Sequence, residues 1–471
     1  MIADLKPYSN YRESGLLWLG KVPEHWGLVR IKTVLRESDS RSTDGTGTLL
    51  SLTRNRGLIP HREMTDKQHS AKTLIGYKCY KSGQIVMNRM QAWSGMFGSG
   101  AICGLVSPDY AVFDILGGHT EKFILERLKT QDLVGQFALE SKGIGSGFNR
   151  LYTDRFGQIP ISLPPPDEQA AIVRFLGWAN GQLEKAIRAK RKVITLLNEQ
   201  KQVIIHRAVT RGLDSSIPLK PSGIPWLGDI PQHWEVRKLR TLFHTQGSGT
   251  TPSGDYYYGG SINWVMSGDL NDSVIKKTKR TVHGKALIAY STLKLYPENS
   301  IVVAMYGATI GKTGILGVVA CTNQACCVFA QAIRTANVFL LQLIIQTAKP
   351  HLLRAAYGGG QPNINADVVR SLRVPFPPIK EQDAILAHVE LETSGLTTAI
   401  SRFEREIELL REYRTRLVAD VVTGKLDVRE AAVQLPDEAH EPELNDADKS
   451  LSEGDEEYGD LLESIAEELD V

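Results

Sequence analysis

Residues 14–34 read SGLLWLGKVPEHWGLVRIKTV, and residues 222–242 read SGIPWLGDIPQHWEVRKLRTL. The two stretches align with two tryptophans, two glycines, a proline and a histidine in register, at an offset of 208 residues. Two further blocks repeat at an offset of 213 residues: Pro-Pro-x-x-Glu-Gln at 164–169 and 377–382, and Val-Thr-x-x-Leu-Asp at 209–214 and 422–427. Internal repeats of this kind indicate one structural unit used twice. The chain is therefore predicted to consist of two halves built alike.

Between the repeated blocks lie two stretches, 35–160 and 243–373, that match only faintly. Their shared skeleton pairs Ile85-Val86 with Ile301-Val302, Gly95 with Gly311, and Phe123 with Phe339. Strands are predicted at 84–87 and 300–305, and helices at 121–139 and 336–348. A repeated frame around divergent inserts favours one fold that carries two specificities.

A long helix is predicted after each Pro-Pro pair, because residues 167–208 and 380–421 contain no proline and are rich in helix-forming residues. Apolar residues recur in both at the 4-3 spacing of a coiled-coil seam, and at ~1.5 Å per residue such a helix is about 60 Å long. Two separate helices, each packed on its own domain, are the alternative. Gly177, Gly181 and Gly395 predict a break near each helix start. The seam residues are Leu183, Ile187, Ile194, Leu197, Leu396, Ile400, Phe403, Ile407 and Leu410.

The composition of the 471 residues, 42% hydrophobic and 23% charged, is that of a globular protein and excludes a disordered chain or a fibre. No apolar run approaches the ~20 residues that span a bilayer, and residues 1–6 lack the pattern of a signal peptide. The five cysteines form no CxxC pair, which predicts a reducing, cytoplasmic location without a disulfide framework or zinc site.

The formal net charge of +2 conceals an uneven distribution. Residues 435–471 contain fifteen acidic residues and one lysine, whereas the rest of the chain has 54 Lys+Arg and 38 Asp+Glu. A basic body attracts polyanions such as nucleic acid. The acidic C-terminal segment is interpreted as a solvated tail, with a partner-binding or DNA-shielding role as the alternative.

Motifs for catalysis mostly fail on inspection, and neither a catalytic nor a metal-binding residue is assigned. The segment 307–313 has three residues between its glycines where a phosphate-binding loop needs four, and a strand is predicted after it. Asp109, Glu140 and Lys142 resemble a magnesium nuclease only loosely. His25 and His233 each neighbour a tryptophan in a proline-bounded turn, which favours packing or capping over base catalysis.

Side chains suited to reading nucleic acid gather in both inserts. Arginine suits guanine, asparagine and glutamine suit adenine, and lysine suits phosphate, and Lys279 and Arg280 extend the basic cluster of the second insert. Each residue alone is more often a solvated surface side chain, so the prediction depends on the clustering. The candidate DNA-binding residues are Arg54, Asn55, Arg56, Arg62, Asn88, Arg89, Gln91, Asn149, Arg150, Thr250, Tyr256, Tyr257, Lys276, Lys277, Tyr306, Lys312, Gln361 and Asn363.

The doubled W-L-G-x-(I/V)-P-x-H-W block, the doubled P-P-x-x-E-Q motif with its long helix, and the run from Gly249 to Leu270 resemble the specificity subunit of type I restriction–modification enzymes. The resemblance covers residues 12–430. It implies an α+β protein in which two mixed α/β target recognition domains are separated by two long antiparallel coiled-coil helices. The implied boundaries are 1–166 and 211–379 for the recognition domains, 167–210 and 380–430 for the spacer helices, and 431–471 for the acidic tail.

The resemblance also implies a function without catalysis by this chain. The partners would be double-stranded DNA with a bipartite, asymmetric target, two methyltransferase subunits, and restriction and translocase subunits. The partner subunits would hold S-adenosylmethionine, ATP and Mg²⁺, and this chain would hold no cofactor. A stand-alone magnesium nuclease and a helical protein-binding scaffold are the alternatives.

Overall fold

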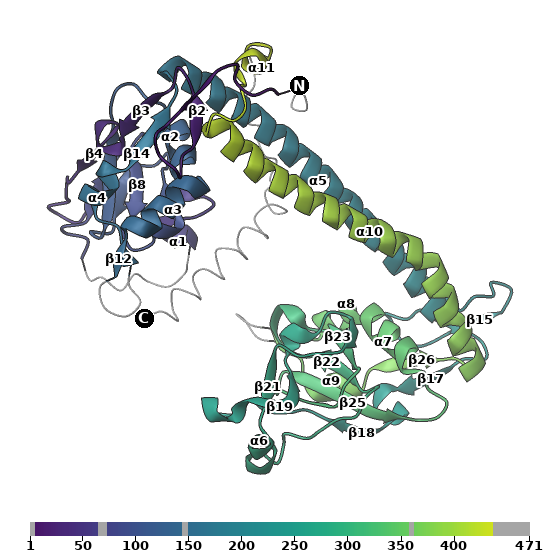
Figure 1. Cartoon of the computed structure of the whole chain (residues 1–471). Coiled ribbons are helices and arrows are strands. Elements are labelled where there is room, and N and C mark those ends of the chain that lie inside the picture. Colours follow the sequence, from purple (N-terminus) through teal and green to yellow (C-terminus); the bar gives the residue numbers. More distant parts are fainter. Residues whose placement is uncertain (1–4, 65–72, 144–148, 358–361, 437–471) are drawn as a thin grey trace. The chain divides into compact units, whose positions relative to one another are not determined.

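The computed structural model describes residues 5–64, 73–143, 149–357 and 362–436, which form two compact units. Unit 1 consists of Met1–Arg191 and Arg405–Val471, and unit 2 is Lys192–Glu404. Each boundary falls inside one of two long helices, α5 (Pro166–Arg211) and α10 (Ile379–Val422), drawn in blue-teal and yellow-green in Figure 1. Both units mix helices with strands, so the chain is α+β as the sequence predicts.

Unit 1 is built on an antiparallel sheet of four strands in the order β4-β11-β8-β9. Shorter antiparallel pairs surround it, namely β1–β2, β3–β14, β5–β6, β7–β10 and β12–β13. The bounds are β1 (Tyr11–Glu13), β2 (Lys21–Pro23), β3 (Gly27–Arg30), β4 (Leu35–Ser38), β5 (Leu50–Thr53), β6 (Gly57–Pro60), β7 (Lys78–Tyr80), β8 (Ile85–Asn88), β9 (Phe97–Gly98), β10 (Gly104–Val106), β11 (Tyr110–Ile115), β12 (Lys142–Gly143), β13 (Asn149–Arg150) and β14 (Pro160–Leu163).

Unit 2 repeats this sheet in the order β18-β25-β22-β23 and extends it with a fifth strand, β20, parallel to β23. The pairs β15–β16 and β17–β26 correspond to β1–β2 and β3–β14, whereas the three-stranded sheet β21-β19-β24 has no counterpart among the sheets described in unit 1. The bounds are β15 (Leu219–Pro221), β16 (Asp229–Pro231), β17 (Glu235–Lys238), β18 (Phe243–Gly247), β19 (Tyr258–Val265), β20 (Ser273–Ile275), β21 (Arg280–Val282), β22 (Ile301–Ala304), β23 (Thr313–Leu316), β24 (Ala320–Thr322), β25 (Cys326–Ala332) and β26 (Arg373–Phe376).

The sheet register confirms the predicted pairing of Ile85-Val86 with Ile301-Val302, whereas the pairing of Phe123 with Phe339 is wrong, since Phe123 is buried and Phe339 is 44% exposed. Ile85 lies opposite Phe113 across β8 and β11, and Ile301 lies opposite Phe329 across β22 and β25, at the same offset of 216 residues. In each unit the central strand is buried on both faces, which explains why it is a continuous apolar run rather than an alternating one. Helices cover one face: α2 (Glu121–Leu128) and α3 (Gln131–Glu140) in unit 1, α7 (Val338–Thr347) and α8 (Lys349–Arg354) in unit 2.

The Pro-Pro-x-x-Glu-Gln motif fastens each long helix to its unit. The side chain of Gln169 accepts a hydrogen bond from the backbone N–H of Thr120, the residue before α2, at 3.0 Å and donates to the carbonyl of Pro164 at 2.9 Å. Gln382 makes the equivalent bonds to Asn337, before α7, and to Pro377, each at 2.8 Å. Both glutamine side chains are buried. Their amides therefore couple the start of α5 to the start of α2, and the start of α10 to the start of α7.

The glutamate of the same motif binds the tryptophan block. In unit 1 Glu168 accepts hydrogen bonds from the hydroxyl of Tyr8 at 2.7 Å and from Nε1 of Trp26 at 3.0 Å, and lies 2.7 Å from Nε2 of His25. Burial and the bond to Glu168 raise the pKa of Tyr8, which therefore stays a neutral donor. In unit 2 Glu381 lies 2.8 Å from Nε2 of His233. The histidines thus join blocks of the repeat, as a packing or capping role requires.

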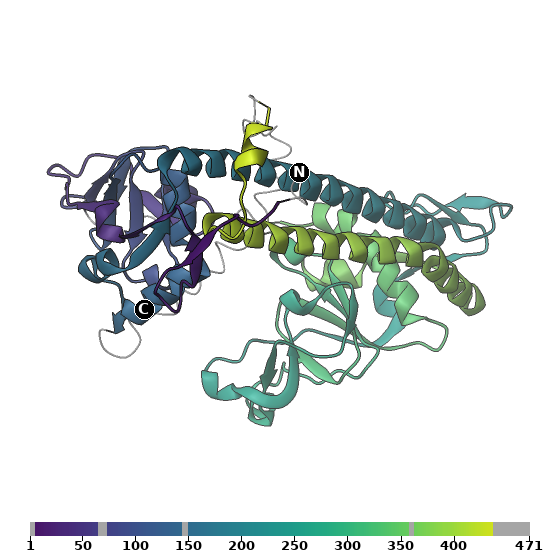
Figure 2. The same ribbon diagram turned by 45° about the horizontal axis from the view of Figure 1, so that its top comes forward.

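The long helices lie side by side and antiparallel within each unit (Figures 1 and 2). In unit 1 the Lys190 ammonium lies 2.5 Å from the Glu406 carboxylate, and in unit 2 Lys201 donates to the hydroxyl of Thr397 at 3.0 Å. All nine predicted seam residues are buried or half-buried. The predicted breaks at Gly177, Gly181 and Gly395 are wrong: both helices run through these glycines, because the packed seam outweighs a cost of ~1 kcal/mol per glycine.

The end of each long helix belongs to the core of the unit opposite to the one where it begins. Ala208 and Val209 of α5 are buried in unit 2, and their repeat equivalents Val421 and Val422 of α10 are buried in unit 1. Within two residues of its end each helix is followed by a glycine with positive φ, Gly212 (71°) or Gly424 (79°), as left-handed helix caps require. Unit 1 is then closed by both ends of the described chain, because the N–H of Asp427 donates to the carbonyl of Lys6 at 2.8 Å.

Other sequence predictions need adjustment. The helix predicted at 121–139 is two helices, α2 and α3, which separate at Lys129 and Thr130 where the fully buried Arg127 donates to the Thr130 hydroxyl. The strand predicted after the glycine-rich segment at 307–313 is present as β23. The acidic segment from residue 437 onward lies outside the described residues. None of the described helices combines the length and apolar character needed to cross a membrane.

Candidate nucleic-acid interface

The central strand of each unit leads into a short 3-10 turn, and this turn forms the core of the candidate interface. In unit 1, β8 is followed by η3 (Ala92–Ser94), and in unit 2, β22 is followed by η7 (Gly307–Thr309). The N–H of Leu151 donates to the carbonyl of Arg89 at 2.9 Å, and the N–H of Ile364 donates to that of Met305 at 2.9 Å. These equivalent bonds connect each turn to the described residues that follow a glycine-rich stretch of the sequence, 149–152 in unit 1 and 362–364 in unit 2. We call each turn, together with the residues that pack beside it, the reading edge.

Asn88 and Arg89 shape the reading edge of unit 1 from inside. The side-chain oxygen of Asn88 accepts from the N–H of Met90, and its amide donates to Oε1 of Gln91, each at 3.1 Å. The guanidinium of Arg89 lies 2.5 Å from the Glu37 carboxylate. Asn88 is 9% exposed, and both side chains use their polar atoms within the unit. The sequence marks the right segment, but these two residues support the turn.

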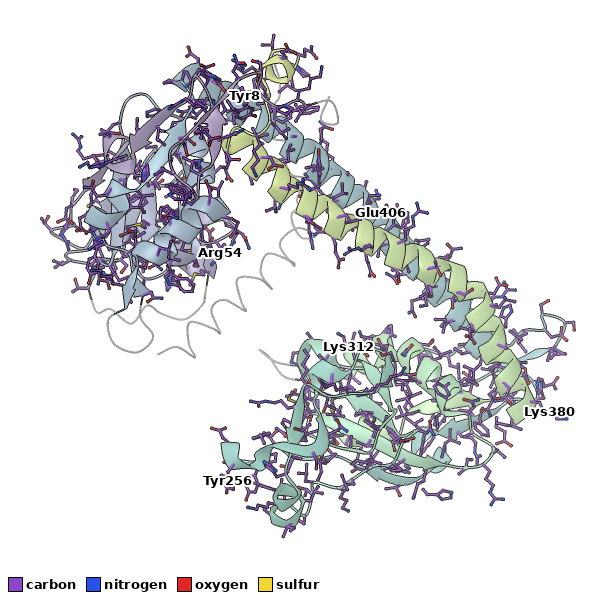
Figure 3. The ribbon with its side chains drawn as sticks, in the orientation of Figure 1. Tyr8, Arg54, Tyr256, Lys312, Lys380 and Glu406 are labelled. Atoms are coloured by element: carbon purple, nitrogen blue, oxygen red, sulfur yellow. The ribbon has the colours of Figure 1, made fainter. Side chains whose placement is uncertain are left out.

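The exposed face of this edge carries Arg54 and Asn55, from the turn between β5 and β6. The guanidinium of Arg54, labelled in Figure 3, donates to the carbonyl of Ser94 at 3.0 Å and to its hydroxyl at 3.2 Å, so Arg54 lies against η3. Asn55 is exposed beside it. Trp93, a residue that the sequence analysis missed, is 42% exposed in η3, with Nε1 donating to the carbonyl of Met90 at 2.8 Å.

The hairpin β12–β13 completes the edge in unit 1, with β13 packed against η3. Asn149 is exposed, and Arg150 lies 3.5 Å from the carboxylate of Asp109 and 5.7 Å from the ring centre of Tyr152. Tyr152, also missed from the sequence, is 42% exposed. An exposed aromatic ring beside arginine and asparagine can stack on or pack against a base. Arg56, in the same turn as Arg54, is half-buried, and Arg62 is exposed in α1 (His61–Met64), beyond the other end of β6.

The reading edge of unit 2 has the same frame with other side chains. Tyr306, at the start of the turn, is 36% exposed, and its backbone bridges to that of Asn363. Lys312, labelled in Figure 3, follows η7 and is half-buried, and the N–H of Gly307 donates to the carbonyl of Pro362 at 2.8 Å. The adjacent Tyr357, absent from the sequence prediction, is 61% exposed. Gln361 lies outside the described residues.

The remaining candidates of unit 2 lie away from this edge. The backbone of Thr250 is used internally, since its N–H donates to Thr322 at 3.1 Å and its carbonyl accepts from Nε1 of Trp264 at 3.2 Å. The rings of Tyr256 and Tyr257 are 4.2 Å apart, and Tyr256 is 69% exposed. Their hydrogen bond is the main cause that raises the pKa of Tyr257 to about 12. Lys276 and Lys277 are exposed after β20.

The nuclease-like residues are not assembled into a site. Asp109 lies by Arg150, and Glu140 lies 3.2 Å from the guanidinium of Arg155. Lys142 is exposed on β12. Within the described parts of the chain, no group of three or more His, Cys, Asp or Glu side chains is arranged to hold a metal ion.

Outside the seam, the long helices expose apolar side chains at equivalent positions. Leu196 on α5 is 55% exposed and Leu409 on α10 is 48% exposed, and they are related by the offset of 213 residues. In unit 2 the exposed neighbours of Leu196 on α5 are Val193 and Val203, and in unit 1 Tyr413 is exposed one turn from Leu409. Each unit therefore carries its own apolar patch on its part of the helix pair.

Comparison with known proteins agrees with these features. Residues 231–408 match the family model described as the type I restriction modification DNA specificity domain. The MjaVIII specificity subunit of a type I restriction enzyme from Methanocaldococcus jannaschii is 23% identical over 312 residues, which cover 62% of this chain and 68% of that protein. A type I restriction enzyme specificity subunit of Escherichia coli is 25% identical over 281 residues, covering 55% of this chain and 62% of that protein.

A solved structure supports the fold. A chain from work on complex assembly and conformational transition of the type I R-M system superposes with a TM-score of 0.56. It is 14% identical, and the match covers 86% of this chain and 99% of that chain.

Proposed function

Because the chain carries a type I restriction modification DNA specificity domain, we propose that it is the DNA-recognition subunit of a type I restriction–modification complex. It selects where the complex acts and performs no chemistry itself. Methyltransferase and restriction subunits hold S-adenosylmethionine, ATP and Mg²⁺, and the complex works on DNA in the cytoplasm.

The observation that carries this proposal is the duplicated reading edge. The bonds from Leu151 to Arg89 and from Ile364 to Met305 give both edges the same backbone frame. The side chains on that frame differ: arginine, asparagine and tryptophan in unit 1, tyrosine and lysine in unit 2. Two edges with one geometry and different hydrogen-bonding groups suit a DNA target made of two unlike halves.

The reading edges would each enter the major groove and contact a few bases. The antiparallel helices would then set the interval between the two half-sites, about one helical turn of DNA or ~34 Å, and leave the intervening bases unread. A bound methyltransferase would flip an adenine out of the stack within each half-site. This division of labour requires that the partners dock close to the helices that define the spacing.

The apolar patches around the equivalent residues Leu196 and Leu409 fit this requirement. Large exposed apolar side chains on a polar helix surface mark protein contacts. One patch in each unit supports two methyltransferase subunits, each contacting one of the two equivalent leucines. The restriction subunits would join the complex beyond them.

The decisive experiment is a map of methylated adenines in cells that express this chain with its methyltransferase partner. The expected motif is bipartite and asymmetric, with a gap of fixed width. Replacement of residues 35–160 by another recognition domain should change one half of the motif only, and a change in both halves would overturn the modular reading. Cleavage of duplex DNA by the purified chain alone would support the nuclease instead. Equal gel shifts on cognate and scrambled duplexes would support the protein-binding scaffold.

A further inference from the structure

Unit 2 contains a separate lobe, formed by the sheet β21-β19-β24 and helix α6 (Gly284–Ala289). The lobe has its own small core around Trp264, Val282 and Leu293, each at most 3% exposed. The N–H of His283 donates to the carbonyl of Tyr257 at 2.7 Å, which closes the lobe. Residues 276–280 lead from the end of β20 into β21 across the surface of the lobe. We call them the basic segment.

Four of the five residues in the basic segment are exposed cations: Lys276, Lys277, Lys279 and Arg280. The fifth, Thr278, is 4% exposed, and its hydroxyl donates to the carbonyl of Arg280 at 2.7 Å. The same hydroxyl lies 3.3 Å from Oδ1 of Asn263 on β19, so the buried threonine attaches the segment to the lobe while its neighbours are exposed. Lys285 and Lys294, on and after α6, add two more exposed cations, and residues 274–296 contain no acidic residue.

Among the described residues of unit 2, none forms an ion pair with these cations. No described carboxylate lies within ion-pair distance of the four. The nearby carboxylate of Asp269 accepts backbone N–H groups, from Met266 at 2.9 Å and from Lys279 at 3.4 Å. The guanidinium of Arg280 lies 5.0 Å from the ring centre of Tyr258, which holds it in place. Closely spaced cations without internal partners repel one another, so this surface favours an external polyanion.

The position of the basic segment separates it from base reading. It begins at the end of β20, whereas β23, the parallel neighbour of β20, begins just after η7 at the reading edge. The three residues of β20 span about 10 Å at ~3.3 Å per residue, which equals the rise of about three base pairs along the DNA axis. Figure 3 shows Lys312, at the reading edge, and Tyr256, on the lobe, at clearly different places in unit 2.

We propose that residues 276–280 bind the phosphates of DNA beside the bases that unit 2 reads, independently of sequence. The contact rests on the proposed function of the chain in DNA recognition, and it adds a clamp that belongs to the second recognition domain. In unit 1 the described part of the corresponding sheet ends at β9, with no strand equivalent to β20 and no such segment after it. The two recognition domains thus differ in how they hold the DNA backbone, and not only in which bases they read.

The test is the salt dependence of DNA binding by the full chain with its methyltransferase partner. Anisotropy titrations use a duplex with the mapped motif and a scrambled duplex, from about 50 to about 300 mM salt. We expect Lys276→Gln/Lys277→Gln to weaken binding to both duplexes by the same factor. The slope of log K against log salt should fall by about 1.8, since each lost phosphate contact removes about 0.9. Lys276→Arg/Lys277→Arg should keep the slope.

Arg373→Gln/Lys380→Gln is the matched control, because both residues are exposed cations of unit 2 outside the lobe. It removes the same charge and should leave the slope unchanged. An unchanged slope in the Lys276→Gln/Lys277→Gln variant would overturn the proposal, and so would a changed methylation motif. An unchanged slope would indicate that the basic segment binds another polyanion, such as the acidic segment of this chain. If wild-type binds both duplexes equally, the proposed function fails, but the slope still decides whether the basic segment contacts phosphate.

Discussion

The imidazole Nε2 of His25 lies 2.7 Å from a carboxylate oxygen of Glu168, and the two residues are 143 positions apart in the chain. His233 and Glu381 repeat the contact at 2.8 Å in unit 2. The tryptophan block and the Pro-Pro-x-x-Glu-Gln motif therefore contact each other, and they do so once in each unit. Its surroundings differ: Trp26 also donates to Glu168, whereas Nε1 of the buried Trp234 has no hydrogen-bond partner among the described residues.

This difference predicts unequal stability effects. Glu168→Ala should lower the free energy of unfolding by about 3 kcal/mol, because it leaves the buried donors of Tyr8 and Trp26 unsatisfied. Glu381→Ala should cost about 1 kcal/mol, because its bond to the partly exposed His233 is replaced by water. Urea unfolding followed by tryptophan fluorescence measures both. Equal losses would contradict the different roles assigned to the two carboxylates.

The helix seam can be tested against the apolar patches beside it. Ile187 is 1% exposed, so Ile187→Ala should destabilise the chain by about 3 kcal/mol. Leu196→Ala should change stability by less than about 0.5 kcal/mol, because Leu196 is largely solvent-exposed. Thermal unfolding of the two variants gives the comparison, and a large loss for Leu196→Ala would show that it packs within the chain.

The same leucines should control partner binding. Leu196→Asp and Leu409→Asp should each remove one methyltransferase subunit from the purified complex, and the double variant should remove both. Mass photometry or native mass spectrometry reads the stoichiometry directly. Val274→Asp, at an exposed apolar residue on β20, is the control and should leave the complex intact. Full assembly of the double variant would reject the patches as docking sites.

Substitution of Arg54 or Asn55 should change base preference only in the half-site that unit 1 reads. Arg54→Ala or Asn55→Ala should reduce discrimination at one position of one half-site by about 1–3 kcal/mol. The half-site read by unit 2 should stay as it is. Methylation mapping resolves the two halves, and relaxed sequence preference in both would contradict the assignment of Arg54 to a local edge.

Cysteine labelling tests the core of unit 2. Burial raises the pKa of Cys321 to about 12 and that of Cys327 to about 11, and it raises the pKa of Cys326 as well. Because the thiolate is the reactive form, these thiols should resist iodoacetamide at about pH 8, while the exposed Cys103 reacts. Peptide mass spectrometry reports each site. Urea should abolish the protection, and labelling of Cys327 in the folded chain would contradict the buried sheet.

The fold was predictable where the sequence repeats a physical requirement. The tryptophan blocks, the Glu-Gln motif and the apolar stripe recur because each unit needs the same helix attachment and the same seam. The break between α2 and α3 was not predictable, because it depends on the buried pairing of Arg127 with Thr130 and Asp132, a tertiary interaction without a periodic signal.

The candidate interface was predictable as a region but not residue by residue. The sequence identified the segment containing Asn88 and Arg89, yet the side chains of both residues support the turn. For Arg89 this role depends on its contact with Glu37, some fifty residues earlier, which the sequence does not show. Trp93 was missed because tryptophan side chains are highly buried on average. Lys276 and Lys277 were included among the DNA-binding candidates as lysines suited to phosphate, and only the strand order separates them from the reading edge.

The exchange of helix ends between the two cores has a consequence for synthesis on the ribosome. Unit 2 is one continuous stretch and has all its residues once Glu404 has emerged. Unit 1 is begun first but lacks Val421, Val422 and the strand partner of Lys6 until the last described residues are made. The half of the protein that is translated earliest is therefore the half that is completed last, and a premature stop in α10 after Glu404 would leave unit 2 whole and unit 1 unfinished.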